Sequence, residues 1–263
     1  MNIGFCQFNV VYKNVEANLN RIKVMINNSG ADLIVLPELC FSGYFFHSKE
    51  ELFQYSNERI QKNIISELQL IAKDNDLYIV AGIAEKEVDK LYNSAIIGGP
   101  EGCIGKHRKV NLTMNEKIFD SGSTFEVITL GKVKIGIVIC FESWFPESYR
   151  TLSLQGAQII CCPSNFGGPL TPDVLKVRSL ENKVYTVLAN RTGSEYSGTE
   201  TEHFRGESQI IDYEGNILAK AGNEDCIKVV DVNPYETLRK DNIICDDMLF
   251  EMSKYEKYVK YKT

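Results

Sequence analysis

The stretch from Val133 to Glu147 holds the residue with the clearest potential for chemistry in this chain. An apolar run rich in Val and Ile ends abruptly at Cys140, and Pro146 then opens a predicted helix. A thiol at the carboxyl end of a buried strand, just before a helix, lies where open α/β sheets place their active sites. A buried structural cysteine is the common alternative, so a nucleophilic role for Cys140 depends on partners elsewhere in the sequence.

A nucleophilic thiol requires a base, and the sequence offers two kinds. Histidine is the usual base, but His47, His107 and His203 each lie among polar neighbours in predicted loops. Glu38 follows the apolar segment from Ala31 to Pro37, where burial would raise the pKa of its carboxyl group toward neutrality. Such a carboxylate takes a proton from a thiol and returns it to a leaving amine, so Glu38 is the favoured base. A helix cap or a surface acid is the alternative for this residue.

A cationic partner is available in Lys109, which follows Arg108 in a predicted loop. A lysine near a cysteine lowers the pKa of the thiol, and it stabilises the oxyanion that forms when a thiolate adds to a carbonyl. Glu116 lies seven residues further on and would orient Lys109 or the leaving group. The alternatives are a solvated basic cluster for Lys109 and an exposed acid beside Lys117 for Glu116.

Composition sets the broad class of protein. The chain has 263 residues, of which 44% are hydrophobic and 24% charged, and its net charge is −6. The acidic balance argues against nucleic acid or an anionic membrane as the main partner. There is no signal-peptide pattern and no window near ~18 apolar residues, the length of a membrane span. The eight cysteines include no C-x-x-C pair and lie mostly in apolar runs, so we expect reduced thiols and a cytoplasmic protein without a metal site.

Short apolar strands alternate with amphipathic helices, which predicts an α/β fold of sheets covered by helices. Strands are predicted at residues 2–10, 31–37, 77–83, 94–98, 126–130, 133–139, 158–162, 184–190 and 226–232, with a hairpin over 205–219 turning at Glu214-Gly215-Asn216. Helices are predicted from a cap at Asn14 to Gly30, and at about 57–74, 146–155 and 172–182. Three glycines favour a loop from Gly99 to Leu112. The hairpins near 126–139 and 206–219 indicate mixed sheets.

The chain shows no repeat, linker or low-complexity segment. We therefore expect one domain over residues 1–263. Its last part, from about residue 233, is charged and rich in tyrosine, and we expect it to be a tail that packs on the body or on a partner.

Three segments together resemble the nitrilase superfamily of carbon–nitrogen hydrolases. They are LPEL around Glu38, HRKVNL around Lys109 and GIVICFESWFPE around Cys140. The order Glu, Lys, Cys is the catalytic triad of that family, and Glu116 in EKIFDSGS matches a second glutamate seen in its active site. The resemblance continues through residues 178–195 and 204–222 and covers about residues 1–232.

The resemblance implies a fold and an assembly. The fold is a four-layer αββα sandwich of two mixed β-sheets covered by helices. Two such units are expected to associate across a helix-rich face into a homodimer or a higher homo-oligomer.

The resemblance also implies a mechanism. Glu38 acts as general base on Cys140, whose sulfur adds to the substrate carbonyl. Lys109 and the backbone N–H of Phe141 hold the oxyanion. Glu38 then protonates the leaving amine and activates the water that hydrolyses the thioester, so neither a metal nor an organic cofactor is required.

Some positions depart from the family pattern. Asn111 stands where histidine is frequent, and His107 precedes Arg108 where tyrosine is frequent. Phe141 and Glu142 replace the more usual pair of an aromatic residue and aspartate. The triad is unaffected, and we expect Glu142 to be a structural, hydrogen-bonding acid at the turn after the nucleophile.

The pattern C-aromatic-acid-x-x-F-P-E resembles amidases and N-carbamoyl-amine hydrolases, and the segment from Trp144 to Glu147 resembles the carbamoylputrescine hydrolase type. The expected substrate is therefore a small linear amide or ureido compound. A nitrile hydrolase remains an alternative, although true nitrilases carry Trp-Glu directly after the cysteine, and so does a catalytically idle member that serves in binding or assembly. Trp144, Tyr44, Asn165 and Phe166 are predicted to wall the substrate pocket, with plain aromatic packing as the alternative.

Overall fold

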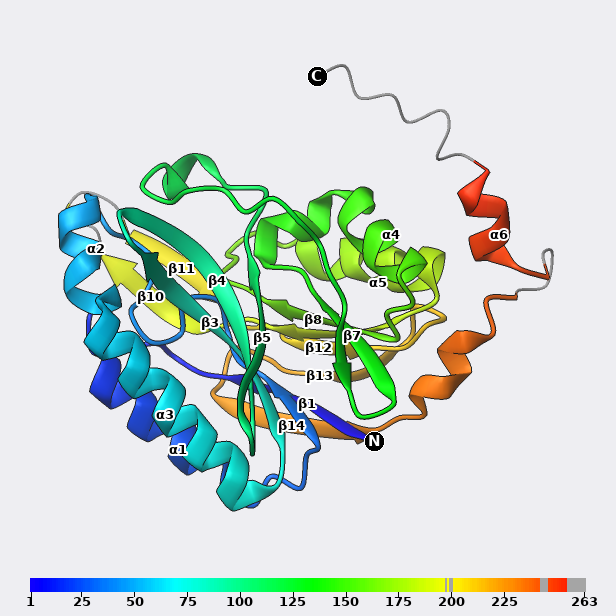
Figure 1. Cartoon of the computed structure of the whole chain (residues 1–263), viewed down its shortest axis with the longest axis horizontal. Helices are drawn as coiled ribbons and strands as arrows, with labels where there is room; N and C mark the ends of the chain where they lie inside the picture. Colours follow the sequence, from blue (N-terminus) through cyan, green and yellow to red (C-terminus); the bar gives the residue numbers. More distant parts are fainter. Residues whose placement is uncertain (197, 199–200, 242–245, 255–263) are drawn as a thin grey trace.

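Two six-stranded β-sheets face each other in the computed structural model, which describes residues 1–196, 198, 201–241 and 246–254. A pair of helices covers the outer side of each sheet, so the layers follow the order α, β, β, α (Figure 1). The predicted four-layer sandwich of two mixed sheets is confirmed. Cys245 and residues 255–263, which belong to the predicted tail, lie outside the described residues.

The first sheet has the strand order β14-β1-β2-β3-β4-β5. Strands β1, β2 and β3 run parallel to one another, and the other pairings are antiparallel. Helices α1 (Val15–Ile26) and α3 (Glu58–Asn75) cover its outer face, and Asn14 caps α1 as predicted by accepting a bond from the N–H of Ala17 (Figure 1). The strands are β1 (Asn2–Gln7), β2 (Leu33–Val35), β3 (Tyr78–Glu87), β4 (Lys90–Gly99), β5 (Gly102–Arg108) and β14 (Cys226–Asp231).

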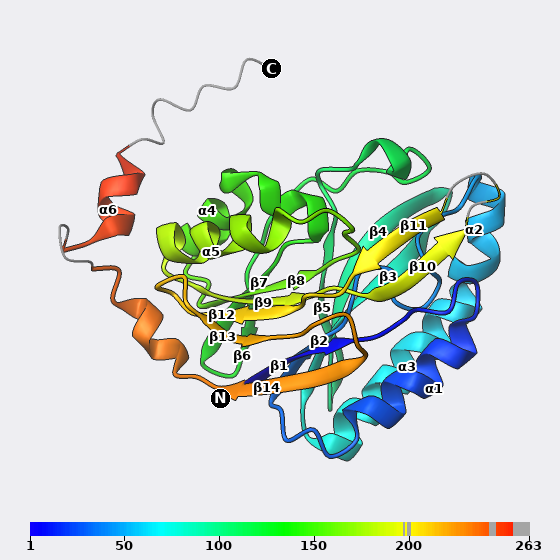
Figure 2. The same cartoon turned by 180° about the vertical axis from the view of Figure 1, so that it is seen from behind.

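The second sheet has the strand order β13-β12-β9-β8-β7-β6, with β7, β8 and β9 parallel. Helices α4 (Pro146–Leu154) and α5 (Thr171–Asn182) cover its outer face (Figure 2). Pro146 occupies the start of α4, as predicted, where a missing N–H costs no hydrogen bond. The strands are β6 (Ile128–Leu130), β7 (Val133–Ile137), β8 (Ile159–Pro163), β9 (Tyr185–Ala189), β12 (Gln209–Ile211) and β13 (Ile217–Lys220).

Three buried apolar clusters hold the four layers together. The central cluster joins the inner faces of the two sheets, with Phe5 and Val80 from the first sheet and Ile137 and Val187 from the second. The other two clusters bind α1 and α3 to the first sheet, and α4 and α5 to the second. The neighbours Cys161 and Cys162 lie in different clusters, because successive residues of β8 point to opposite faces of the sheet.

The prediction of a loop from Gly99 to Leu112 is wrong over residues 102–108. Residues Gly102–Arg108 form β5, which pairs antiparallel with β4 at the edge of the first sheet. Only Gly102, at the turn, has a positive φ, of 114°, so Gly105 lies in the strand without needing the freedom of glycine. His107 is consequently a buried strand residue and not a loop residue.

Several short elements were not predicted. Helix α2 (Lys49–Ser56) follows the Glu38 region, and β10 (Thr192–Tyr196) pairs with β11 (Thr201–Arg205) in a separate hairpin. His203 lies on β11, so its predicted loop position is also wrong. After β14 the chain forms a 3₁₀ helix, η3 (Pro234–Leu238), and α6 (Met248–Ser253), which lies apart from the two sheets in both views (Figures 1 and 2). No helix in the described ranges is long and apolar enough to cross a membrane.

Candidate active site

Glu38 lies just beyond the carboxyl end of β2, and its side chain is buried. The turn that carries it is hydrogen-bonded to Gly82 on β3, through the carbonyl of Pro37 and the N–H of Cys40. The two segments approach closely because residue 82 has no side chain. A Cβ at Gly82 would lie 2.5 Å from the Cα of Glu38.

We expect Gly82→Ala to force the Glu38 turn away from β3. The added methyl group should lower the free energy of unfolding by about 1–3 kcal/mol, the usual cost of overpacking, and should reduce any activity that uses Glu38. Urea denaturation measures the first effect. Gly98→Ala on β4 is the matched control, because the nearest atom to its added Cβ would be 3.7 Å away. Equal destabilisation by the two substitutions would contradict this account.

Lys109 directly follows β5 and places its ammonium group between two carboxylates. Its Nζ donates to Oε1 of Glu38 at 2.6 Å and to both oxygens of Glu116 at 2.8 and 3.0 Å. The side chains of all three residues are at most 1% exposed. Lys109 thus joins Glu38, which lies 71 positions earlier in the sequence, and Glu116, which lies 7 positions later, in one buried ionic cluster.

Asn93 completes this cluster and was not identified from the sequence. Its Nδ2 donates to Oε1 of Glu38 at 2.6 Å and to Oε1 of Glu116 at 2.5 Å. The sequence did contain a signal for this residue, because Asn93 is a polar residue on a strand that is otherwise mostly apolar. The predicted strand began at residue 94, one position too late to include it.

Burial and mutual attraction set the charges of the cluster. Burial opposes the charge of Lys109, but Glu38 and Glu116 outweigh burial and raise its pKa well above the usual value. For Glu116, burial acts to raise the pKa of the carboxyl, but the Lys109 ammonium together with hydrogen bonds from Thr113 and Asn93 lowers it. For Glu38, burial is the larger effect, and with the repulsion from Glu116 it raises the pKa against the pull of Lys109. One carboxylate is therefore held ionised and the other is closer to protonation.

Cys140 begins the 3₁₀ turn η2 (Cys140–Trp144), which joins β7 to α4. Its φ is 48°, in the left-handed region that residues other than glycine rarely adopt, and such strain is concentrated at functional sites. Cys140 is partly buried. Burial and the charge of Glu38 raise the pKa of the thiol well above its usual range, although Lys109 acts in the opposite direction. The thiol is therefore protonated at neutral pH and needs a base to become a nucleophile.

Some buried polar atoms around this cluster have no hydrogen-bond partner within the described part of the chain. They include Oε2 of Glu38, Oδ1 of Asn93, and both Oδ1 and Nδ2 of Asn165. Buried polar atoms are nearly always hydrogen-bonded in folded proteins, so atoms of this kind need an explanation. A bound polar ligand would provide partners for atoms of this kind.

The structure brings Tyr44 to the ionic cluster. Its hydroxyl lies 3.0 Å from Oγ1 of Thr113, and burial together with Glu116 and Glu38 raises the pKa of its hydroxyl. Its backbone N–H donates to Glu195, which fixes this segment against β10.

Phe166 and Trp144 differ from each other in burial. The ring of Phe166 is buried in the apolar cluster beneath α4 and α5, against which Cys140 also packs. Trp144 is 42% exposed, and its Nε1 lies 3.4 Å from Oγ1 of Thr171 at the start of α5. The ring of Phe141 packs edge-to-face on Phe145, and a role for its N–H stays a prediction.

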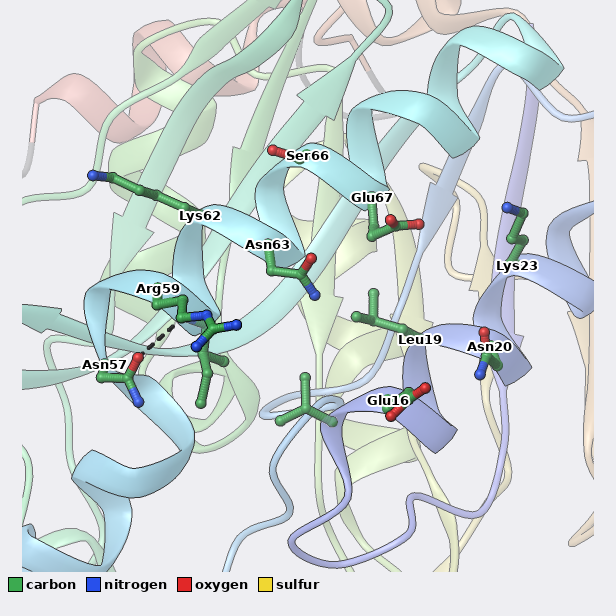
Figure 3. A pocket seen from close by; sticks show the side chains of 12 residues that line it. Glu16, Leu19, Asn20, Lys23, Asn57, Arg59, Lys62, Asn63, Ser66 and Glu67 are labelled. Carbon is green, nitrogen blue, oxygen red and sulfur yellow. Dashed lines mark hydrogen bonds between the residues drawn. The ribbon is translucent and has the colours of Figure 1, made fainter.

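A groove of about 840 Å³ lies away from this site, between α1 and α3 (Figure 3). Acidic residues such as Glu16 and Glu67 and basic residues such as Lys23 and Lys62 line it together. None of its lining residues belongs to the buried ionic cluster. No group of three or more His, Cys, Asp or Glu side chains in the described ranges could hold a metal ion.

Comparison with known proteins identifies the family. The family model described as carbon-nitrogen hydrolase matches residues 2–237. The chain belongs to this family, within the nitrilase superfamily. Among its relatives, a protein named nitrilase from Pyrococcus abyssi (strain GE5 / Orsay) is 40% identical over 243 residues, which cover 89% of this chain and 90% of the relative. An N-carbamoylputrescine amidase from Solanum tuberosum is 31% identical over 234 residues, covering 80% and 77% of the two chains.

Solved structures of the family show the same fold. A carbon-nitrogen hydrolase from Helicobacter pylori G27 matches with a TM-score of 0.87 at 20% identity and covers 100% of this chain and 99% of its own. A mutant amidase from Nesterenkonia sp. AN1 matches with a TM-score of 0.83 at 21% identity, covering 98% and 100%. The αββα sandwich is thus the fold of this family, and the family is one of carbon–nitrogen hydrolases.

Proposed function

We propose that this protein is a thiol hydrolase that cleaves the non-peptide C–N bond of a small linear amide or N-carbamoyl amine through a thioester on Cys140. One observation carries the proposal. Oε1 of Glu38 is held by Lys109 and Asn93, while Oε2 is buried without a partner among the described residues. A carboxylate anchored through one oxygen and unpaired at the other is suited to proton transfer, and its raised pKa brings it closer to the operating pH.

In the first half of the proposed reaction, Oε2 of Glu38 takes the proton of the Cys140 thiol as the sulfur attacks the carbonyl carbon. A C–S bond forms, and the carbonyl oxygen becomes an oxyanion that Lys109 and the N–H of Phe141 stabilise. When this intermediate collapses, the C–N bond breaks and Glu38 passes its proton to the leaving nitrogen. Ammonia or an amine departs, and the acyl or carbamoyl group remains on sulfur.

In the second half, Glu38 takes a proton from a water molecule that attacks the thioester. A C–O bond forms, the C–S bond breaks, and the thiol of Cys140 regains a proton. The proposed steps place all proton transfer on Glu38 and all covalent chemistry on Cys140, so they call on neither a metal nor an organic cofactor.

The remaining residues have supporting roles in the proposal. Glu116, whose pKa is lowered, stays ionised and keeps Lys109 charged and in place. The unpaired amide of Asn165 and the hydroxyl of Tyr44 are suited to bind polar groups of the substrate. Trp144 and Phe166 remain predicted parts of the pocket wall.

Nitrile hydrolysis is a second candidate, because the relative from Pyrococcus abyssi carries the name nitrilase. The pair Phe141-Glu142 after the nucleophile favours the amide reaction instead. A catalytically idle role in binding or assembly is disfavoured, because an idle protein would have no need for a buried cluster of two carboxylates and an ammonium group, which is costly to fold.

Ammonia release from a panel of aliphatic amides, ureido acids and nitriles distinguishes these functions. We expect turnover of amides or ureido acids, none of nitriles, and complete loss in Cys140→Ala. Turnover of nitriles alone would replace the proposed substrate class, and no turnover of any compound would favour the idle role. Activity that survives in Cys140→Ala would overturn the mechanism.

We further propose that two copies associate through the face of α5 into a homodimer. The large apolar side chains of Leu170, Val177 and Leu180 are 58%, 52% and 47% exposed there, at helical spacing. Light scattering should therefore show a dimer for the native chain and a monomer for Leu180→Glu. Val24→Glu is the control, because Val24 is an exposed apolar residue on α1, on the opposite side of the sandwich. A native monomer, or a dimer that tolerates Leu180→Glu, would contradict this assembly.

A cytoplasmic location is also proposed. All cysteines in the described ranges are free thiols, as is usual in a reducing compartment. Cell fractionation tests this location, and recovery of the protein outside the cytoplasm would contradict it.

A further inference from the structure

One buried carboxylate joins the two backbone segments that carry the thiol and the ammonium group. Oε2 of Glu142 accepts the N–H of Ile139 at 2.6 Å, and Oε1 accepts the N–H of Val110 at 2.6 Å. Ile139 directly precedes Cys140, and Val110 directly follows Lys109. The Glu142 side chain is completely buried, so these bonds are shielded from water.

His107 provides the third donor to this carboxylate. Its Nε2 lies 2.9 and 3.1 Å from the two oxygens of Glu142, and its ring stacks on Phe125 with centroids 5.1 Å apart. His107 lies two residues before Lys109, and because alternate residues of a strand point to the same side, both side chains point to the interior. Lys106 and Arg108 point to the other side of β5, where both pair with Glu85.

The hydrogen bonds from His107 and Val110 to Glu142 cross from one sheet to the other. β5 belongs to the first sheet, whereas the turn η2 follows β7 of the second sheet. Apolar packing joins the two sheets elsewhere, but apolar packing is not directional. Hydrogen bonds are directional, so the carboxylate can fix the distance and orientation between the two segments more closely than packing alone.

We propose that His107 and Glu142 form a positioning pair that holds the Lys109 ammonium against the Cys140 sulfur for the reaction. The proposal rests on the function proposed above. The imidazole orients the carboxylate through Nε2, and the carboxylate holds both backbones. Catalytic groups must be held within about 0.5 Å of their working geometry, and a displacement of about 1 Å costs roughly 100-fold in rate.

Three substitutions separate this role from plain packing. His107→Leu removes the donor and should lower kcat about 10- to 100-fold while KM stays within about 3-fold. It should also raise the apparent pKa for alkylation of Cys140 by iodoacetamide, because Lys109 no longer lies close to the sulfur. His107→Gln can place its amide Nε2 where the imidazole Nε2 lies, so it should restore kcat to within about 3-fold of the native value. Glu142→Gln, which has the same shape, should behave like His107→Leu because its amide presents an N–H to a backbone N–H.

The control is His203→Asn, which removes an exposed imidazole on β11 and should leave every value unchanged. Native kcat and a native alkylation profile in folded His107→Leu or Glu142→Gln would overturn the proposal. A loss of kcat with an unchanged alkylation profile and no rescue by His107→Gln would also overturn it, since that result describes packing only. If His107→Leu does not fold, the kcat and the alkylation profile of Glu142→Gln test the proposal instead. Failure of the proposed function gives a different result, because either Cys140→Ala would remain active or the native protein would turn over no compound of the panel.

Discussion

Glu38→Gln is expected to reduce kcat by about 100- to 10,000-fold, the range supplied by a general acid–base group. The amide has nearly the shape of the carboxylate and can still accept from Lys109, so the protein should fold. It cannot take the thiol proton, because its second terminal atom carries hydrogens instead of a free lone pair. The thiol of Cys140, whose pKa is raised well above its usual range, would then stay protonated at neutral pH.

The pH dependence of kcat/KM provides a second measurement on the same variant. Burial raises the pKa of Glu38, and the ionised form is the base. Activity should therefore fall as the pH decreases through a value above about 4.3, the usual pKa of a glutamate, and this limb should be absent from the residual activity of Glu38→Gln. Glu58→Gln on the surface of α3 is the control and should keep the native profile. More than about one tenth of native activity in Glu38→Gln would contradict a role for Glu38 as the base.

Lys109→Met is expected to affect stability as strongly as activity. The substitution leaves Glu38 and Glu116 buried without their counter-charge, and breaking a buried ion pair from one side costs about 3–5 kcal/mol. Urea denaturation at pH 7 should show this loss, together with the loss of turnover. Lys62→Met, which breaks an exposed pair with Glu58 on α3, should cost less than about 1 kcal/mol.

The sign of the pH effect on this variant follows from Glu116. In the native protein its pKa is lowered, so its contribution to stability is present at neutral pH and is lost as the pH falls. Without Lys109, burial would raise the pKa of both carboxyls, and protonation would then relieve the unpaired charge. The difference in unfolding free energy between native protein and Lys109→Met should therefore be smaller at pH 5 than at pH 7. A variant that unfolds at the native urea concentration at pH 7 would contradict this view of the cluster.

The sequence was most informative where apolar strands end. Glu38 and Cys140 each follow a continuous apolar run, and such runs are recognisable because parallel strands are buried on both faces. The position of Lys109 was harder to predict, because three glycines led to the prediction of a loop where the structure has β5. Its role as the cationic partner of Cys140 was predicted from chemical reasoning and from the family motif, without a predicted position in a sheet.

Other parts of the site depend on tertiary contacts that local patterns do not encode. Asn93 binds both carboxylates from a strand whose predicted start excluded it. Asn165 and Phe166 are adjacent, yet the side-chain amide of Asn165 is buried without a partner among the described residues, while the ring of Phe166 packs beneath α4 and α5. The β10–β11 hairpin went unrecognised because its polar residues gave no apolar alternation. Sequence patterns report burial along one element, whereas a site is assembled from several elements.

The central claim is that Cys140 carries the substrate's acyl or carbamoyl group during turnover. Peptide mass mapping after a rapid acid quench of the native protein, during turnover of an amide or N-carbamoyl substrate, tests it most directly. We expect the peptide that contains Cys140 to gain the mass of that group, and the gain to be absent in Cys140→Ala. Continued release of ammonia with Cys140 unmodified, or with the adduct on another residue, would contradict the account.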